Sequence, residues 1–482
     1  MTITKTSIFA LFAAVFTGCT VGPDYHSPST TMPARWAPPM AMAASAPSQT
    51  VAKSHEVADW WKTFGDPVLD KLVAEAVSGN LTLQQAEARI RQARASRGVT
   101  EAAWWPDLNA TADYRRTRTP NGQGGGIEAN QYRAGFDSVW ELDVFGATSR
   151  AVEASDANII AAVEDRRNVL VTLLGDVALN YIDLRGAQER IKLAQNNLLT
   201  QQRTLDVTRR QFAGGFVAGL DVANAEAQVA STRSIIPGLE SQARQDIYAL
   251  AVLLGREPGA LIEQLTPSAP IPTTPPEVPV GLPSELLRRR PDIRRAEAQL
   301  HASTALIGVA VADLYPRFSL TGNIGVSSGT LAGLGNLNNQ NWGIGPSASW
   351  QLFSAGRVQS NILVQKALRD QSTLAYRQTV LTALGEVESA LVAYAKDQER
   401  RAAQYDSVVA NRRAAALSRQ LYEAGQIDFL NVLNSARSLL VVEDAYSQST
   451  SRVAADLVAL YKALGGGWES NAYPATQPKL AE

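Results

Sequence analysis

The sequence is poor in the residues that build disulfides and metal centres. Its 482 residues include one cysteine, three histidines and four methionines. A single cysteine excludes an intrachain disulfide, and His26, His55 and His301 are too scattered to show the spacing of a metal site. The glycine run at 124–126 lacks the lysine and hydroxyl residue of a phosphate loop. We therefore predict no cofactor, no metal site and no enzymatic activity.

An excess of one charge and long apolar runs are also lacking. The 45 basic and 46 acidic residues nearly cancel, so composition gives no argument for binding nucleic acid. The densest basic cluster, LLRRRPDIRR at 286–295, is interpreted as the solvated start of a helix, with an electrostatic patch as the alternative. Beyond the N-terminal segment no stretch is apolar for 18 residues. Any membrane crossing by the mature chain must therefore use β-structure.

The N-terminus predicts an exported lipoprotein. Lys5 precedes the apolar segment SIFALFAAVF, which is too short for a transmembrane helix, and FTGC follows. Small residues before a lone cysteine are what a lipoprotein signal peptidase recognises. We predict a signal peptide at 1–18 and lipidation at Cys19; a buried free thiol behind an ordinary signal is the alternative. Thr20 is not the aspartate that retains lipoproteins at the inner membrane, which favours the outer membrane.

The chain repeats itself at an offset of 210 positions. The stretch RRQFAGGFVAGLDVANA at 209–225 returns as RQLYEAGQIDFLNVLNS at 419–435. The same register joins further pairs: Pro106 with Pro316, Trp140 with Trp350, Gly146 with Gly356, and Gly215 with Gly425. A register that does not slip predicts an internal duplication. The predicted segments are an N-terminal tether, a first repeat, a proline-rich linker, a second repeat and a tail, at 19–67, 68–255, 256–285, 286–465 and 466–482.

Each repeat shows the same predicted order of elements. A helical run stops before Pro106 or Pro316, two strand-like runs follow, and a long helix covers about 147–212 or 357–422. A straight helix of that length measures about 100 Å, more than a globular core. The glycine turns then fold each repeat into an antiparallel hairpin with a coiled-coil seam. Periodicity alone leaves a soluble helical bundle as the alternative.

The four strand-like runs alternate between apolar and polar residues. They cover 107–115, 131–142, 317–327 and 341–352, and their apolar residues stand at even positions. This alternation and the terminal aromatics are typical of transmembrane β-strands, with a small sandwich as the alternative. Four strands cannot close a barrel, and open edges in lipid leave backbone groups unpaired, so several chains must share one barrel. Three chains suit a conduit better than two.

Several motifs carry a family resemblance along nearly the whole chain. They are GCTVGPDY, WWKTFGDPVLDKLV (60–73), GLPSELLRRRPDIRRAEA (281–298), WQLFSAGR (350–357) and LYKALGGGW (460–468). With these motifs the chain resembles the TolC-like outer-membrane efflux proteins. Within them it is similar to the NodT/OprM-type lipoproteins that serve tripartite resistance-nodulation-division (RND) pumps.

The resemblance implies a mixed α+β membrane protein. Four transmembrane strands per chain would complete the 12-stranded β-barrel of a homotrimer in the outer membrane, continued by a long α-helical barrel across the periplasm. Residues near 30–65, 262–285 and 466–482 would form an equatorial region. The implied partners are a periplasmic adaptor protein, an inner-membrane RND transporter and outer-membrane lipid, with no nucleic acid.

The implied function is passive conduction of drugs or small molecules from the periplasm to the exterior. In the same architecture, the alternative is a duct for type I protein secretion or for metal-ion efflux. An alternative of another class is a non-conducting structural outer-membrane lipoprotein with a helical stalk.

The resemblance also implies a periplasmic gate at the hairpin turns. Relatives use a tyrosine on one hairpin and an aspartate on the other, which match Tyr422 and Asp221 here; helix capping is the alternative for Asp221. Aspartates at the narrowest point of relatives correspond to Asn431 and Asn434, whose spacing places them on one helix face. Contact with neighbouring helices is the alternative for this pair. Asp428 lies nearby in the turn.

Overall fold

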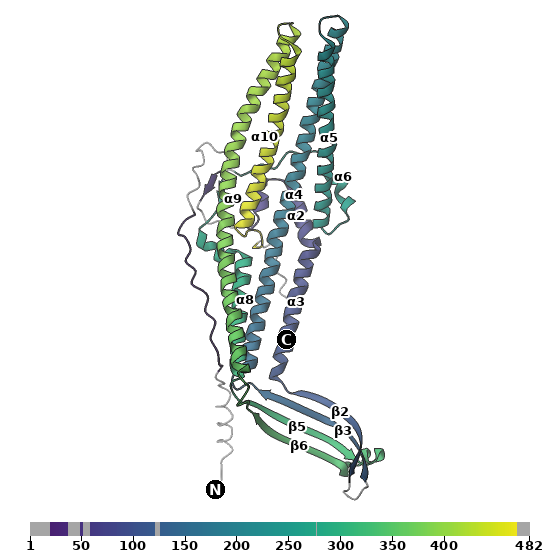
Figure 1. Ribbon diagram of the computed structural model, residues 1–482, viewed down its shortest axis with the longest axis vertical. Helices are drawn as coiled ribbons and strands as arrows, with labels where there is room; N and C mark the ends of the chain where they lie inside the picture. The colour runs from purple at the N-terminus through teal and green to yellow at the C-terminus, as the bar shows by residue number, and fades with distance from the viewer. Residues whose placement is uncertain (1–19, 37–48, 52–57, 121–125, 276, 470–482) are drawn as a thin grey trace. The chain divides into compact units, whose positions relative to one another are not determined.

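The structure, a computed structural model, describes residues 20–36, 49–51, 58–120, 126–275 and 277–469 (Figure 1). The predicted signal peptide, Cys19 and most of the predicted tail lie outside the described residues. The chain divides into two compact units. Unit 1 consists of Met1–Ser29, Ala88–Val163 and Arg295–Gln378, and unit 2 consists of Thr30–Glu87, Glu164–Arg294 and Thr379–Glu482.

Unit 1 contains a four-stranded antiparallel sheet in the order β2-β3-β5-β6 (Figure 1). The strands are β2 (Asp107–Pro120), β3 (Gly126–Leu142), β5 (Arg317–Ser328) and β6 (Gln340–Ser349). The register pairs even positions with even positions: Leu108 with Ser138, Phe136 with Ile324, and Ile324 with Trp342. The alternating apolar residues of all four strands therefore lie on one face of the sheet.

That apolar face is exposed in the single chain. Leu108, Phe136, Ile324, Trp342 and Ile344 are 71%, 53%, 49%, 73% and 71% exposed. A sandwich would have buried these side chains against a second layer. The alternative of a small sandwich with a buried apolar face is therefore wrong for the described chain.

The strand ends differ from the predicted ones. β2 and β3 extend further toward their connecting loop, and an ion pair between Arg116 and Glu128 joins the two strands along this extension. β6 ends at Ser349, before the predicted end. Trp350 lies after the strand, where its indole Nε1 donates a hydrogen bond to the carbonyl oxygen of Leu314 at 3.0 Å.

Two helical hairpins follow the strands (Figure 1). The first consists of α4 (Ala147–Ala213) and α5 (Gly219–Leu253), and the second of α9 (Arg357–Glu423) and α10 (Phe429–Ala463). α4 and α9 each contain 67 residues, and α5 and α10 each contain 35. All four bounds recur at the offset of 210 positions, so the repeated sequence forms repeated structure.

Shorter elements complete the described chain. The helices are α2 (Pro67–Gly79), α3 (Leu81–Glu101), α6 (Ile262–Leu265), α7 (Leu286–Arg289) and α8 (Pro291–Ala312). The 3-10 segments are Trp60–Phe64, Ala102–Trp104, Pro258–Leu261, Pro283–Glu285, Leu331–Gly335 and Leu337–Asn339. In unit 2, β1 (Gln49–Val51) pairs in parallel with β4 (Glu277–Pro279).

The helical run predicted at the start of each repeat is divided in the structure. Asn80 separates α2 from α3: its Oδ1 accepts from the backbone N–H of Leu83 at 2.9 Å, and its Nδ2 donates to the carbonyl of Leu253 at 2.8 Å. It therefore caps α3 and holds it against the end of α5. Arg290 separates α7 from α8, because a residue before proline, here Pro291, disfavours the helical conformation.

The basic cluster at 286–295 contributes a buried ion pair, and its interpretation as a solvated helix start is wrong at Arg290. This side chain is 8% exposed. Its guanidinium donates to Glu386 at 2.6 Å, to Asp292 at 2.7 Å and to the carbonyl oxygen of Ala463 at 3.0 Å. These contacts satisfy the charge inside the fold, so Arg290 offers no patch to an external anion.

Aromatic side chains fill the core of unit 2. Trp60 is 2% exposed and stacks on Tyr461, with ring centroids 5.3 Å apart. The hydroxyl of the fully buried Tyr181 donates to Asp66 Oδ2 at 2.7 Å. Within the described ranges, none of the helices is both long enough and apolar enough to cross a membrane.

Candidate functional site at the hairpin ends

Each hairpin turns at a glycine in the left-handed conformation. Gly215 has a φ of 76° and Gly425 a φ of 70°. In the first turn, the N–H of Gly215 bonds to the carbonyl of Phe212 and that of Phe216 to the carbonyl of Gln211, both at 2.9 Å. The second turn repeats this pattern, which is the Schellman motif that ends a helix. The matched glycines of the repeat are therefore the residues that reverse the chain.

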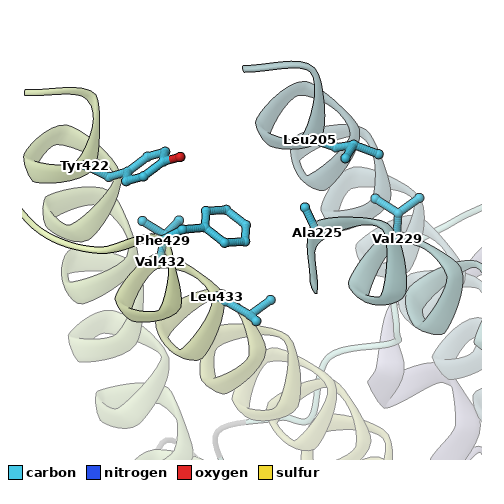
Figure 2. Packing of buried hydrophobic residues seen from close by; sticks show 7 residues of the cluster. All are labelled: Leu205, Ala225, Val229, Tyr422, Phe429, Val432 and Leu433. Carbon is cyan, nitrogen blue, oxygen red and sulfur yellow. The ribbon is translucent and has the colours of Figure 1, made fainter. Parts of the chain in front are cut away.

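An apolar cluster joins the two hairpins just behind these turns (Figure 2). We call it the hairpin cluster; its buried members are Leu205 of α4, Ala225 and Val229 of α5, Tyr422 of α9, and Phe429, Val432 and Leu433 of α10. The ring centroids of Tyr422 and Phe429 lie 5.6 Å apart at 59°. Because its members come from all four long helices, this cluster ties the end of one hairpin to the end of the other.

The predicted gate residue Tyr422 belongs to this cluster. It is 6% exposed, and its hydroxyl donates to Oε1 of Gln211 on the other hairpin. Burial raises the pKa of Tyr422; a hydrogen bond with Thr208 opposes the rise, and the nearby charge of Asp221 adds to it. Tyr422 and Asp221 thus lie close enough to interact by charge, while the direct hydrogen-bond partner is Gln211.

Asp221 does not cap the helix that follows the turn. Ala218 holds the N-cap position of α5, and the backbone N–H of Asp221 donates to its carbonyl at 3.0 Å. The alternative that Asp221 caps this helix is therefore wrong. Its carboxylate lies in the first turn of α5, where negative charge interacts favourably with the helix dipole.

The three remaining predicted gate residues lie at the start of α10. Asp428 is the N-cap residue, although its side chain makes no capping bond, and Asn431 and Asn434 follow within the first turns. All three are exposed, whereas Val432 and Leu433 between them are buried in the hairpin cluster. The structure therefore places both asparagines on the outward side of α10, away from the residues that join the hairpins.

The predicted junction residues lie between helices and strands. Pro106 and Pro316 directly precede β2 and β5, and Gly146 and Gly356 directly precede α4 and α9. The two glycines have φ values of 77° and 83°. Such left-handed angles let the chain leave the sheet and start a helix within a few residues.

A repeated tryptophan contact supports each junction. The indole Nε1 of Trp140 donates to the carbonyl of Trp104 at 2.8 Å, and that of Trp350 donates to the carbonyl of Leu314 at 3.0 Å. The donors and the acceptors are both 210 positions apart. The sequence match between the tryptophans thus reflects one structural role in both repeats.

Sequence reasoning missed Gln211 as the partner of Tyr422. The duplicated sequence nevertheless contains an indication of this contact. Gln211 and Phe212 of the first repeat correspond to Leu421 and Tyr422 of the second, so each repeat carries one polar and one apolar residue in opposite order. The observed hydrogen bond joins the polar residue of one repeat to the polar residue of the other.

A family model described as outer membrane efflux protein matches the chain twice, at residues 72–256 and 282–466. Nodulation protein T of Rhizobium leguminosarum bv. trifolii is 32% identical over 464 residues, which cover 95% of this chain and 96% of that protein. The probable efflux pump outer membrane protein TtgC of Pseudomonas putida is 32% identical over 483 residues, which cover 98% of both chains.

Among solved structures, the outer-membrane channel OprN is similar to this chain with a TM-score of 0.86 and 38% identity. The match covers 94% of this chain and 100% of that one. The similarity therefore extends over nearly all of this chain and over the whole of a known channel.

Proposed function

Because this chain belongs to the outer membrane efflux protein family, we propose that it is the outer-membrane channel of a tripartite efflux system. The resemblance to TolC-like channels seen in the motifs is confirmed by the family match and by the similarity to OprN. In this role the chain conducts drugs or other small molecules passively from the periplasm to the exterior. The free energy for transport comes from an inner-membrane partner.

The observation that carries this proposal is the exposed apolar face of the four-stranded sheet. Side chains such as Trp342 and Ile344 are more than two-thirds exposed in the single chain, and lipid is the medium that removes them from water. β2 and β6 are edge strands, so their outer backbone groups need partners. Three chains joined edge to edge meet both needs as a homotrimer with one 12-stranded barrel.

In this proposal the helical hairpins form the periplasmic part of the channel. Three copies of α4, α5, α9 and α10 surround a tunnel that continues the barrel. The linker at 256–285 and the flanking segments 19–67 and 466–482 contribute an equatorial region around the two repeats, 68–255 and 286–465. The turns at Gly215 and Gly425 then lie at the periplasmic end of the tunnel.

These turns form the gate of the channel in our proposal. Tyr422 and Asp221 take part in holding the hairpins together in the closed state. Asn431 and Asn434, with Asp428 beside them, line the narrowest point. Their exposure on α10 supports this role, since no other element of the described chain covers them.

We propose that the chain lies in the outer membrane and is anchored by lipid on Cys19 after removal of residues 1–18. Two or more acyl chains make a stable anchor where a single one is marginal. Mass spectrometry of the mature N-terminus tests this step, and an unmodified Cys19 contradicts it. The partners are a periplasmic adaptor protein and an inner-membrane RND transporter, which copurification from a cross-linked membrane would identify.

Planar-bilayer recording on the purified trimer tests the function. We expect long-lived conductance steps that require no added energy source. A correctly folded trimer without conductance would favour a non-conducting structural lipoprotein. Deletion of the gene should raise the cellular accumulation of pump substrates. If the accumulation of small molecules is unchanged, loss of a secreted protein would favour a duct for type I secretion, and loss of metal tolerance would favour a duct for metal-ion efflux.

A further inference from the structure

A cavity lies between the two hairpins of one chain, beside the hairpin cluster. Its volume is about 310 Å³, within the range of small-molecule sites. Ala225, Phe429 and Leu433 give it an apolar surface that continues into the hairpin cluster. Side chains of α4, α5, α9 and α10 all line it, so a molecule bound there touches both hairpins.

Three buried polar side chains line the cavity. Gln201, Gln228 and Glu443 are 8%, 7% and 8% exposed. Oε1 of Gln228 accepts from Arg437 Nε at 2.6 Å, and Oε1 of Glu443 accepts from Arg412 Nε at 2.8 Å. Oε1 of Gln201, by contrast, has no hydrogen-bond partner in the described part of the chain. A buried acceptor without a partner has lost its hydration without gaining a hydrogen bond, so a donor from a ligand is stabilised there.

The wall around Gln201 offers acceptors. The hydroxyls of Thr200 and Thr204 donate to the carbonyls of Asn196 and Thr200 on their own helix, both at 3.1 Å. Their oxygen lone pairs remain free to accept, and Gln201 adds its Oε1. This side of the cavity therefore selects a ligand with an O–H or N–H group.

The opposite wall carries positive charge. Arg412 and Arg419 of α9 both line the cavity. Glu443 balances the charge of Arg412, whereas Arg419, at the exposed edge of the cavity, makes no hydrogen bond or ion pair with any residue that the structure describes. An unpaired guanidinium beside an apolar surface favours a carboxylate or sulfonate and repels a cation.

We propose that this cavity binds a small amphiphilic anion: a flat apolar body with a hydroxyl or amide donor at one end and an anionic group at the other. The donor bonds to Gln201 Oε1, the body contacts Phe429 and Leu433, and the anionic group pairs with Arg419. Because the ligand contacts both hairpins, its binding stabilises their paired arrangement by mass action. Binding itself does not depend on conduction by the channel.

Isothermal titration of the purified full-length protein tests the site with three probes. 6-Hydroxy-2-naphthoate carries both polar groups, 2-naphthoate lacks the hydroxyl, and 2-naphthol lacks the carboxylate. We expect saturable binding of 6-hydroxy-2-naphthoate at one site per chain. Each of the other two should bind about tenfold more weakly, the effect of losing one hydrogen bond or ion pair.

Variants assign the two polar contacts. Gln201→Leu should weaken the binding of 6-hydroxy-2-naphthoate about tenfold and leave the binding of 2-naphthoate unchanged. Arg419→Gln should weaken the binding of both acids but not that of 2-naphthol. Gln404→Leu and Arg413→Gln, on α9 outside the cavity lining, are matched controls that should change nothing. Equal affinities for the three probes on the native protein, absence of saturable binding, or insensitivity to both variants would each overturn the proposal.

Discussion

The hydroxyl of Tyr422, near the end of α9, donates a hydrogen bond to Oε1 of Gln211, near the end of α4. This bond joins the two hairpins of one chain within one turn of the glycines that reverse them. Burial keeps the pKa of Tyr422 above its ordinary value, so the hydroxyl remains a donor through the neutral range. The bond therefore holds the hairpin ends together without depending on physiological changes in pH.

Removal of this donor should loosen the hairpin ends. Tyr422→Phe keeps the ring in the hairpin cluster but loses the bond, at a cost of about 1 kcal/mol. We expect a higher resting conductance in planar bilayers, and a further rise when Asp221→Ala is added. Tyr405→Phe, at a half-exposed position of the same helix, is the control. Unchanged conductance in a folded trimer would remove Tyr422 from the gate.

Because the asparagines at the start of α10 carry no charge, we predict that the channel is only weakly selective for cations. Threefold assembly makes Asn431 and Asn434 two uncharged rings, whereas acidic rings would attract cations. Asn434→Asp should raise cation selectivity and block by a trivalent cation, and Asn431→Asp should do so equally or less. Reversal potentials under a salt gradient measure the first effect and current with added trivalent cation the second. If neither property changes, these residues do not line the constriction.

The turn glycines should tolerate a side chain poorly for conformational reasons alone. An added Cβ at Gly425 meets nothing within 4 Å, yet its φ of 70° is left-handed. Gly425→Ala should therefore destabilise the chain by about 1–2 kcal/mol. Gly385→Ala, inside α9 and equally free of contacts, should stabilise it by about 0.5–1 kcal/mol. Equal thermal shifts for the two variants would contradict the turn geometry.

A buried carboxyl pair in unit 2 should make stability depend on pH. Burial raises the pKa of Asp456 to about 7; the neighbouring Asp397 adds to the rise, and Arg452 and Arg400 oppose it. The folded state therefore binds this proton more tightly than the unfolded state, whose ordinary value is 3.8. The contribution of protonated Asp456 to the free energy of unfolding is present at acid pH and is lost as the pH rises toward about 7.

Asp456→Asn removes this titration. Between about pH 4 and 7, the free energy of unfolding of this variant should rise relative to that of the native chain by at most about 1.4 kcal/mol per pH unit. Asp246, the matching residue of the first repeat, has a pKa raised to about 6 by burial, so Asp246→Asn should show the same trend over a narrower range. Denaturant unfolding at several pH values measures both. A parallel shift of both variants at all pH values would contradict this assignment.

The duplication and the strand alternation could be predicted because both are patterns in the order of residues along the sequence. Identical offsets placed Gly215 and Gly425 at equivalent turns, and parity placed Leu108 and Ile324 on the same face of the sheet. The ends of the long helices agree with the structure within one residue. Periodicity and glycine positions determine these features without knowledge of distant contacts.

Features that depend on distant partners could not be predicted in the same way. Asn80 divides a helical run because its amide reaches the carbonyl of Leu253, and Arg290 is buried because Glu386 and Ala463 accept its bonds. The cavity between the hairpins likewise exists only where four helices meet. Helical periodicity describes one helix at a time, so it contains no information on these contacts.

We propose that three chains enclose one water-filled pore, with the polar face of the sheet inside and the apolar face in lipid. Asn323 and Ile324 are successive residues of β5 and therefore point to opposite faces. Single-channel recording of Asn323→Cys and Ile324→Cys, before and after a positively charged membrane-impermeant thiol reagent, tests the claim most directly. We predict that the reagent lowers the conductance of Asn323→Cys and leaves Ile324→Cys and the native protein unchanged. The opposite pattern, or the absence of conductance in folded trimers, would contradict the account.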